Sequence, residues 1–483
     1  MTLNVEQCQQ ARLSRDARFD GKFFIAVKTT GIYCRPICPA TSPKEENVSY
    51  FSTAIEAAND GYRPCLRCRP DSAPGSCAFK GVDTTVERAL TLIEQGALAT
   101  GSVESLASRL GISDRYLRLL FKDKLGTTPK QYALYQQLLF AKQLLHQSKL
   151  PITDVAFSSG FNILRRFNDS FKQHFQLTPQ QIRKQQQTSA NHIELILSYR
   201  PPYCWDFLQG FLRKRLIPSL EWIGDKGDER YGRTFTHSDD EGNTLQGDFE
   251  VVHLAEKNAF KVKLTTSQPF NILPVVKNIR RMLDLDADVS VIEQQLSQVD
   301  GLSSSKLLSG LRLPGIWDPF EAGIRAILGQ QISVEAARKL VCQVVECYGE
   351  SYAQKGDNNN SEHFLFPGPS ILSKVDFAIL KIPQSRKNTL MAFSRYCEEH
   401  PHYDNLDDWL TIKGIGPWTV NYAKMRGQSD TDIWLSSDLG VKKALDLLAA
   451  DDADEGDGQV DFNSDAAKPW RSYLTFQCWN LLS

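Results

Sequence analysis

The chain has 483 residues, 41% of them hydrophobic and 23% charged, and this length predicts three to four domains. It contains no run of eighteen apolar residues and no basic start followed by an apolar stretch, so we expect neither a membrane span nor a signal peptide. Residues 1–190 carry 25 basic and 16 acidic side chains (net +9), and residues 191–483 carry 31 and 41 (net −10), so the first part favours a polyanionic partner.

Four of the eleven cysteines form two close pairs near the N-terminus. Cys34 and Cys38 are separated by three residues, and Cys65 and Cys68 by two, a spacing typical of a tetrahedral four-thiolate zinc site. Disulfides are the alternative, but seven scattered cysteines and the missing signal peptide argue for a reducing compartment. Taken alone, a four-cysteine zinc site is most often purely structural.

The residues around these cysteines point to a more specific role. The stretches Thr29–Cys38 and Gly61–Pro70 closely resemble the N-terminal domain of the Ada response proteins, and the resemblance covers about residues 5–72. It implies that Cys34 is both a zinc ligand and the nucleophile that takes a methyl group from a methylphosphotriester in DNA. Zinc supports such a role because it keeps the reactive thiolate form of cysteine.

Methylation of Cys34 would also change the charge of the site. Four thiolates around Zn²⁺ carry a net charge of −2, which repels DNA, and methylating one of them leaves −1. Affinity for DNA should therefore rise after a single irreversible transfer. We expect nearby arginines, Arg35 and Arg67 among them, to contact phosphates, although each alone is more often a surface charge.

Residues 85–184 have the apolar periodicity of helices, as in Val103, Leu106, Ala107 and Leu110. They resemble the DNA-binding domain of AraC-type activators, which implies two helix-turn-helix units turning at Gly111 and Gly160. A helical bundle without a DNA-binding role is the alternative. The recognition helices should present basic side chains to the major groove, and the candidates are Arg115, Arg118, Arg165 and Arg166.

Residues 191–300 mix alternating, strand-like runs with helical ones, whereas residues 315–483 are mostly helical by pattern. The segment Lys413–Pro417 lies between two helical runs and predicts a hairpin in which Gly414 and Gly416 let the backbone approach a phosphate. Such a hairpin binds DNA without reading bases. Gly-x-Gly alone is a weak signal. Here, however, an acidic residue, Asp438, follows the hairpin at a spacing that suggests a shared site.

Residues 192–483 resemble the AlkA-type 3-methyladenine DNA glycosylases, members of the helix-hairpin-helix family. The resemblance implies that Asp438 is the essential carboxylate, which stabilises positive charge on the sugar, and that Trp418, Tyr422 and Trp479 line the pocket for the flipped base. Electron-rich rings suit a cationic methylated base. Without this context Asp438 would be a helix cap and the three aromatics would be core residues.

Two further positions refine this expectation. Glycosylases that also nick the strand carry a lysine where this chain has Trp418, so we expect a monofunctional enzyme. In the family, a leucine acts as a wedge that fills the gap left by the flipped base. Gln331 occupies the matching position in this chain, and a glutamine can still fill that gap. The resemblance also implies a monovalent cation at the hairpin carbonyls. The chain lacks the Pro-Cys-His-Arg motif of full-length Ada, so we expect no repair of O6-methylguanine.

Together these patterns predict a multidomain, mainly α protein with α+β parts. The expected domains are an Ada-like zinc domain, a double helix-turn-helix bundle, a small α+β domain and helix-hairpin-helix glycosylase lobes, at residues 1–72, 85–187, 190–300 and 301–483. We expect a monomer in the bacterial cytoplasm, near the nucleoid, that binds double-stranded DNA and RNA polymerase but no membrane. The alternatives are an activator with a non-catalytic C-terminal half and a glycosylase merely tethered by its N-terminal half.

Overall fold

The structure, a computed structural model, describes two compact units of this chain. The first contains Met1–Pro201, Thr236–Arg280 and Leu285–Ala287, and the second contains Pro202–Phe235, Arg281–Asp284 and Asp288–Ser483. None of the described helices is both long and apolar enough to cross a bilayer. The described residues are 3–65, 68, 70, 84–99, 101–183, 192–225, 227–239, 242–266, 271–299, 302, 306–352, 363–403, 405–454 and 462–482.

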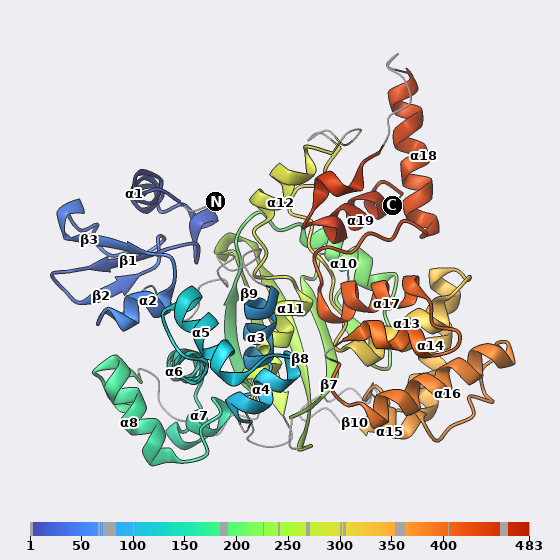
Figure 1. Cartoon of the computed structure of the whole chain (residues 1–483), viewed down its shortest axis with the longest axis horizontal. Helices are drawn as coiled ribbons and strands as arrows, with labels where there is room; N and C mark the ends of the chain where they lie inside the picture. The colour runs from blue at the N-terminus through green and yellow to red at the C-terminus, as the bar shows by residue number, and fades with distance from the viewer. Residues whose placement is uncertain are drawn as a thin grey trace. The chain divides into compact units, whose positions relative to one another are not determined.

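The first unit begins with a four-stranded sheet of order β3-β1-β2-β4 (Figure 1). Strand β1 pairs antiparallel with β2 and β3, and β2 pairs in parallel with β4. The side chains of β1 alternate between two small cores, one containing Ile25 and the other containing Phe24, Ala26 and Tyr33. The elements are α1 (Val5–Ser14), η1 (Ala17–Phe19), β1 (Phe24–Val27), β2 (Ile32–Cys34), η2 (Glu45–Asn47), β3 (Val48–Phe51), α2 (Ala54–Asn59) and β4 (Arg63–Pro64).

The helices that follow confirm the two helix-turn-helix units. Gly111 and Gly160 have φ values of +71° and +88°, which allow the sharp turns after α4 and α7. The repeated Thr-Pro steps at 128–129 and 178–179 begin α6 and α9, each with a capping box. The helices are α3 (Thr84–Glu94), α4 (Val103–Arg109), α5 (Asp114–Leu125), α6 (Pro129–Gln147), α7 (Ile152–Ser158), α8 (Leu164–Phe175) and α9 (Pro179–Ile182).

A second sheet has the strand order β5-β9-β8-β7-β6, and the chain passes between the units within β7. The alternating run at 260–264 lies in β9, where Phe260, Val262 and Leu264 are buried, which confirms the strand expected there. The elements are β5 (Ile193–Ser198), β6 (Glu221–Ile223), β7 (Arg230–Ser238), β8 (Thr244–Leu254), η5 (Ala255–Lys257), β9 (Ala259–Thr266) and α11 (Leu273–Met282).

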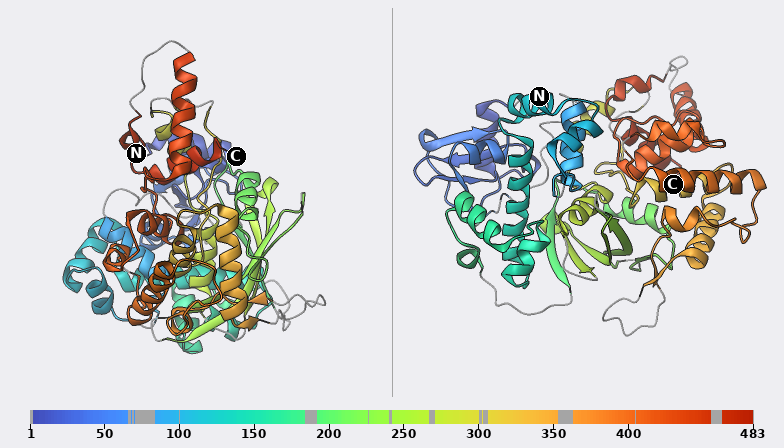
Figure 2. Two further views of the ribbon diagram at one scale, coloured as in Figure 1. Left: turned by 90° about the vertical axis from the view of Figure 1, so that its right-hand side faces the viewer. Right: turned by 60° about the horizontal axis from the view of Figure 1, so that its bottom comes forward.

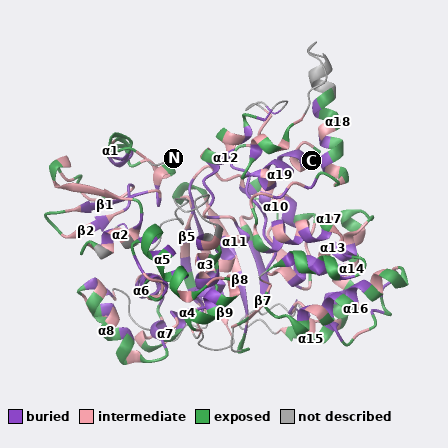
Figure 3. Ribbon diagram, viewed as in Figure 1, coloured by how far each residue is buried: buried purple, intermediate pink, exposed green. Residues whose placement is uncertain are grey.

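The second unit is mainly helical and is built around α13, which packs against α14, α16 and α17 (Figures 1 and 2). Helices α13 and α19 are buried along most of their length (Figure 3). Its helices and short strands are α10 (Trp205–Arg213), α12 (Val289–Leu296), α13 (Pro319–Gly329), α14 (Val334–Tyr348), β10 (Ser351–Tyr352), β11 (His363–Phe364), α15 (Pro369–Leu372), α16 (Gln384–Glu399), η6 (Leu406–Thr411), α17 (Pro417–Ala423), η7 (Lys424–Gln428), α18 (Leu439–Asp454), η8 (Ser464–Ala467) and α19 (Arg471–Asn480).

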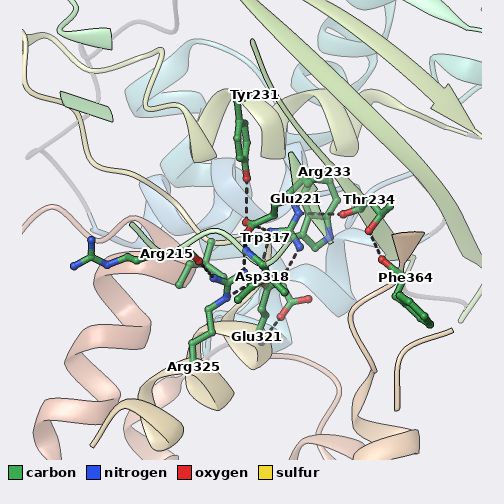
Figure 4. A network of polar contacts seen from close by, with 12 residues as sticks. Arg215, Glu221, Tyr231, Arg233, Thr234, Trp317, Asp318, Glu321, Arg325 and Phe364 are labelled. Atoms are coloured by element: carbon green, nitrogen blue, oxygen red, sulfur yellow. Dashed lines mark hydrogen bonds and ion pairs between the residues drawn. The ribbon is translucent and has the colours of Figure 1, made fainter. Parts of the chain in front are cut away.

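A buried ionic network attaches α13 to strands β6 and β7 (Figure 4). The Arg233 guanidinium donates to both carboxylate oxygens of Glu321 at 3.3 and 2.8 Å, and Arg325 Nε donates to Glu321 at 2.9 Å. Glu221 adds a second carboxylate, 3.4 Å from Arg325, and accepts from the Tyr231 hydroxyl at 3.1 Å. Two carboxylates thus balance two guanidiniums in a site that excludes water.

We expect Glu321→Gln to lower the free energy of unfolding by about 3–5 kcal/mol, because it leaves a buried guanidinium without its compensating charge. Burial alone would raise the pKa of Glu321, but the charges of Arg233 and Arg325 lower it. The contribution of Glu321 is therefore present above the ordinary carboxyl pKa of about 4.3, begins to fall near that pH and is lost as the pH drops through the lowered pKa of the folded state. Urea-induced unfolding followed by circular dichroism at pH 7 and pH 4 measures both effects.

Glu335→Gln is the matched control, since Glu335 pairs with Lys339 at 2.8 Å on the surface, where the two side chains are 71% and 66% exposed. Exposed pairs contribute little, so the urea midpoint should stay at its original value. Equal effects of the two substitutions would contradict a stabilising role for the buried network.

Candidate active site and metal centre

The four clustered cysteines meet at one point of the first unit. Cys34 ends β2 and Cys65 follows β4, and the parallel pairing of these strands brings the two cysteine pairs together. The four Sγ atoms lie within 4.8 Å of one another. Tetrahedral zinc with bonds of about 2.3 Å separates its sulfurs by about 3.8 Å, so the cluster fits this metal. The sequence prediction of a four-thiolate site is confirmed.

The chemistry of the cluster also fits a cation. The close approach of the other three thiols, together with burial, raises the pKa of Cys34, so that a positive ion is needed to favour its thiolate form. Bound zinc would hold the four sulfurs as thiolates. Cys34 and Cys38 are partly exposed, whereas Cys65 and Cys68 are buried, so the nucleophile expected from the sequence lies on the more accessible side.

Arg35, which the sequence predicts to contact a phosphate, is buried beside the cysteine cluster. Its side chain is buried and donates from Nε to Asp20 Oδ1 at 2.7 Å and from Nη1 to the Cys68 carbonyl at 3.3 Å. A second guanidinium nitrogen pairs with the other Asp20 oxygen. In the described structure Arg35 therefore supports the metal-binding loops. Arg67 lies outside the described residues.

The arginines expected on the recognition helices lie on exposed faces. On α5, Arg115 is exposed, and Arg118 is held by Glu104 at 2.8 Å and by Asp114 at 3.1 Å. On α8, Arg165 and Arg166 are both exposed. The opposite faces of both helices are buried, as a helix that enters a groove requires.

The carboxylate of Asp438 lies at the centre of the site in the second unit. Its Oδ1 accepts from the backbone N–H groups of Gly440 and Val441 at 2.9 and 3.1 Å and from Trp479 Nε1 at 2.9 Å. Its Oδ2 accepts from Trp418 Nε1 at 3.2 Å. Asp438 thus caps α18, as the alternative explanation proposed, and also binds two of the predicted pocket aromatics.

The predicted aromatic residues form two walls around this carboxylate. Trp418 and Tyr422 stack with ring centroids 5.3 Å apart, and Trp479 stacks on Phe211 at 6.3 Å. Trp418, Tyr422, Trp479 and Asp438 are each partly exposed. A flat aromatic group can stack on rings of this kind.

Sequence reasoning missed three residues of this region. Phe211 belongs to α10 and precedes its stacking partner Trp479 by more than two hundred residues. Two guanidiniums lie over the Phe211 ring. The Arg215 and Arg426 groups are 3.7 and 4.8 Å from the ring centroid. None of the motifs found in the sequence contains Phe211. Nothing in the local sequence marked Arg215 or Arg426.

The hairpin has the expected turn but a different first helix. Residues Leu406–Thr411 form a 3₁₀ helix and α17 starts at Pro417, with Gly416 as its N-cap. Gly414 has a φ of +94°, and a Cβ there would lie 2.1 Å from Thr389 Oγ1, so only glycine fits. The Gly414 carbonyl accepts from Gln330 Nε2 at 3.1 Å. Gln331, the expected wedge, is exposed with a φ of +60°.

Comparison with known proteins identifies matching families along the chain. The metal binding domain of Ada matches residues 7–71, a helix-turn-helix domain matches 106–185, and the AlkA N-terminal domain matches 194–318. A Mycobacterium tuberculosis protein named "Probable bifunctional transcriptional activator/DNA repair enzyme AlkA" is 32% identical over 99% of this chain and 97% of its own length. This chain belongs to that family.

Two relatives of this AlkA-type chain each match one part of it. The DNA-3-methyladenine glycosylase 2 of Escherichia coli is 27% identical, over 59% of this chain and 95% of the relative. The bifunctional transcriptional activator/DNA repair enzyme Ada of Escherichia coli is 40% identical, over 29% of this chain and 38% of the relative. The predicted fusion of an Ada-type part and an AlkA-type part is thereby confirmed.

Proposed function

We propose that this chain is a DNA glycosylase for alkylated bases of the 3-methyladenine type, joined to a methyl-accepting transcriptional activator. The observation that carries the glycosylase is the Asp438 carboxylate, bound by the indoles of Trp418 and Trp479 beside a two-walled aromatic pocket. Membership of the AlkA family supports this assignment. The two activities belong to separate units of the chain.

The chemistry follows from the contacts of Asp438. A damaged base leaves the helix and stacks between the aromatic walls, and cleavage of its N-glycosidic bond builds positive charge on the sugar. Asp438 Oδ1 accepts three hydrogen bonds, whereas among the described residues Oδ2 accepts one, from Trp418. Oδ2 therefore keeps the capacity to stabilise the sugar or to orient a water molecule.

The pocket also suits hydrolysis without strand cleavage. Trp418 occupies the position at which strand-nicking relatives carry a lysine, and its indole is bound to Asp438. No amine from this position can form a Schiff base, so the product is an abasic site. The Gly414 backbone would approach a DNA phosphate, with a monovalent cation on the hairpin carbonyls and Gln331 in the gap left by the base.

The sensor half would act through Cys34. Its thiolate attacks the methyl carbon of a methylphosphotriester, so that an S–C bond forms, the C–O bond breaks and a phosphodiester anion leaves. Losing one thiolate charge reduces repulsion of DNA, and the exposed Arg115, Arg165 and Arg166 are placed to bind it. Transcription then requires a contact with RNA polymerase. Because Arg35 is bound to Asp20, its contact with phosphate would require this pair to open.

We propose that the chain works as a monomer with functional parts at residues 1–72, 85–187, 190–300 and 301–483. The second candidate function is an activator whose C-terminal half binds DNA without cleaving it. Asp438 and the intact hairpin favour the enzyme, and the following experiment separates the two.

We expect Asp438→Asn to lower single-turnover release of 3-methyladenine from duplex DNA by about 100- to 1000-fold while DNA affinity changes little. Release should occur without strand nicking, which gel electrophoresis of the same reaction measures. Asp446→Asn is the matched control, because Asp446 is exposed on the same helix. Near-full release by Asp438→Asn would remove this carboxylate from the mechanism, and no release by the unmodified protein would leave the activator alone.

We expect Cys34→Ala to lose methyl uptake from methylphosphotriester DNA and the accompanying gain in DNA affinity, because the accepting sulfur is gone. Excision should be retained, since the pocket lies in the other unit. Transfer of a radiolabelled methyl group to the protein measures the first effect. Cys347→Ala, which removes an exposed cysteine elsewhere, should leave uptake intact. Methyl uptake by Cys34→Ala would assign the acceptor role to another residue.

A further inference from the structure

Arg426 is a buried cation whose position has no explanation in the mechanism above. Its side chain is 3% exposed, and among the described residues no carboxylate forms an ion pair with it. Burial lowers the pKa of this guanidinium. A buried charge without a counter-ion is costly, in contrast to the balanced pairs of the Arg233–Glu321 network. A buried cation of this kind indicates that its contacts have a role that a neutral side chain could not fill.

One branch of contacts leads from Arg426 to the first aromatic wall. Its Nη1 donates to the Tyr422 hydroxyl at 3.0 Å. Tyr422 stacks on Trp418 with ring planes 22° apart, and Trp418 donates to Asp438 Oδ2. The guanidinium therefore fixes the far end of the ring that supports Trp418.

A second branch leads to the other wall. The Arg426 guanidinium lies 4.8 Å from the centre of the Phe211 ring, within cation–π range. Phe211 stacks on Trp479 with planes 16° apart, and Trp479 donates to Asp438 Oδ1 at 2.9 Å. The two branches start at one guanidinium and end on the two oxygens of one carboxylate.

Both the side chain and the backbone of Arg426 are held by hydrogen bonds on the side away from the rings. Its Nε donates to the Pro314 carbonyl at 2.5 Å, and its own carbonyl accepts from the Ile316 N–H at 2.7 Å. The residue lies in the π-helical turn Lys424–Gln428 that follows α17, a geometry that recurs at functional sites. The guanidinium is therefore held in place on the side away from the rings.

We infer that Arg426 is a positioning residue that holds both aromatic walls of the base pocket and, through the two indoles, the Asp438 carboxylate. The inference rests on the proposed glycosylase activity for its kinetic consequence but not for its structural one. Lysine cannot replace arginine here, because one ammonium group cannot donate to both Pro314 and Tyr422 and also keep the contact with the Phe211 ring.

The structural consequence is tested on the full-length protein labelled with ¹⁵N-tryptophan. The indole N–H resonances of Trp418 and Trp479, assigned from Trp→Phe variants, report their hydrogen bonds to Asp438. We expect Arg426→Met and Arg426→Lys to shift both resonances. Tyr422→Phe removes only the first branch, so it should shift the Trp418 resonance and leave that of Trp479 in place.

Arg312→Met is the matched control. Arg312 is as deeply buried, bonds to the carbonyls of Asp284 and Pro202 at 2.9 and 2.7 Å, and lies over the Tyr203 ring, but it makes none of the pocket contacts of Arg426. If Arg426 only stabilised the fold, the two methionine variants would behave alike. Thermal unfolding of both proteins monitors that general effect.

The kinetic consequence is a lower rate of the chemical step. With enzyme in excess, Arg426→Met should reduce single-turnover release of 3-methyladenine by about 10- to 100-fold at a temperature where both variants are folded, because small misplacements of reacting groups cost this much. Arg312→Met should retain the rate. Unchanged indole resonances in Arg426→Met, or equal shifts in Arg312→Met, would overturn the inference. Absence of release by the unmodified protein would instead overturn the proposed activity and leave the spectroscopic test valid.

Discussion

The hydrogen bonds that the Asp438 carboxylate accepts from two indoles hold the site of the second unit together. Trp418 belongs to α17, Asp438 precedes α18 and Trp479 belongs to α19, so one carboxylate joins three helices. The same oxygens also satisfy the first N–H groups of α18. The same side chain is therefore both a helix cap and a link between helices.

Buried arginines of the second unit have two different kinds of partner, carboxylates in one place and neutral groups in another. Around α13 two carboxylates and two guanidiniums balance one another, and this arrangement fixes β6 and β7 to the helix. Near Asp438, Arg215 and Arg426 lie over the Phe211 ring, and within the described part of the chain the Arg426 side chain has carbonyl, hydroxyl and ring partners but no carboxylate. The Arg426 guanidinium also lies 5.6 Å from the centre of the Tyr422 ring, so one cation contacts a ring of each aromatic stack.

The first unit links its metal centre to the DNA-binding helices by direct contacts. On α6, Lys142 is fully buried and its Nζ donates to the carbonyl of Cys65 at 3.3 Å. Tyr135, from the same helix, donates to the Ala54 carbonyl at 3.1 Å. A change of charge on the four sulfurs therefore changes the electrostatic potential close to the helical bundle, because the low local dielectric strengthens electrostatic effects.

The sequence by itself determined the features that depend on local spacing. Two cysteine pairs and a glycine hairpin each imply one local backbone geometry, and the metal site and the turn at Gly414 lie where these patterns predict them. Tertiary structure alone decided which arginines are buried. Arg35 and Arg426 look like surface charges in the sequence, yet Asp20 and the pocket rings enclose them. It also brought Phe211 against Trp479. Such contacts join residues far apart in the chain, and only the packing of whole helices sets their distance.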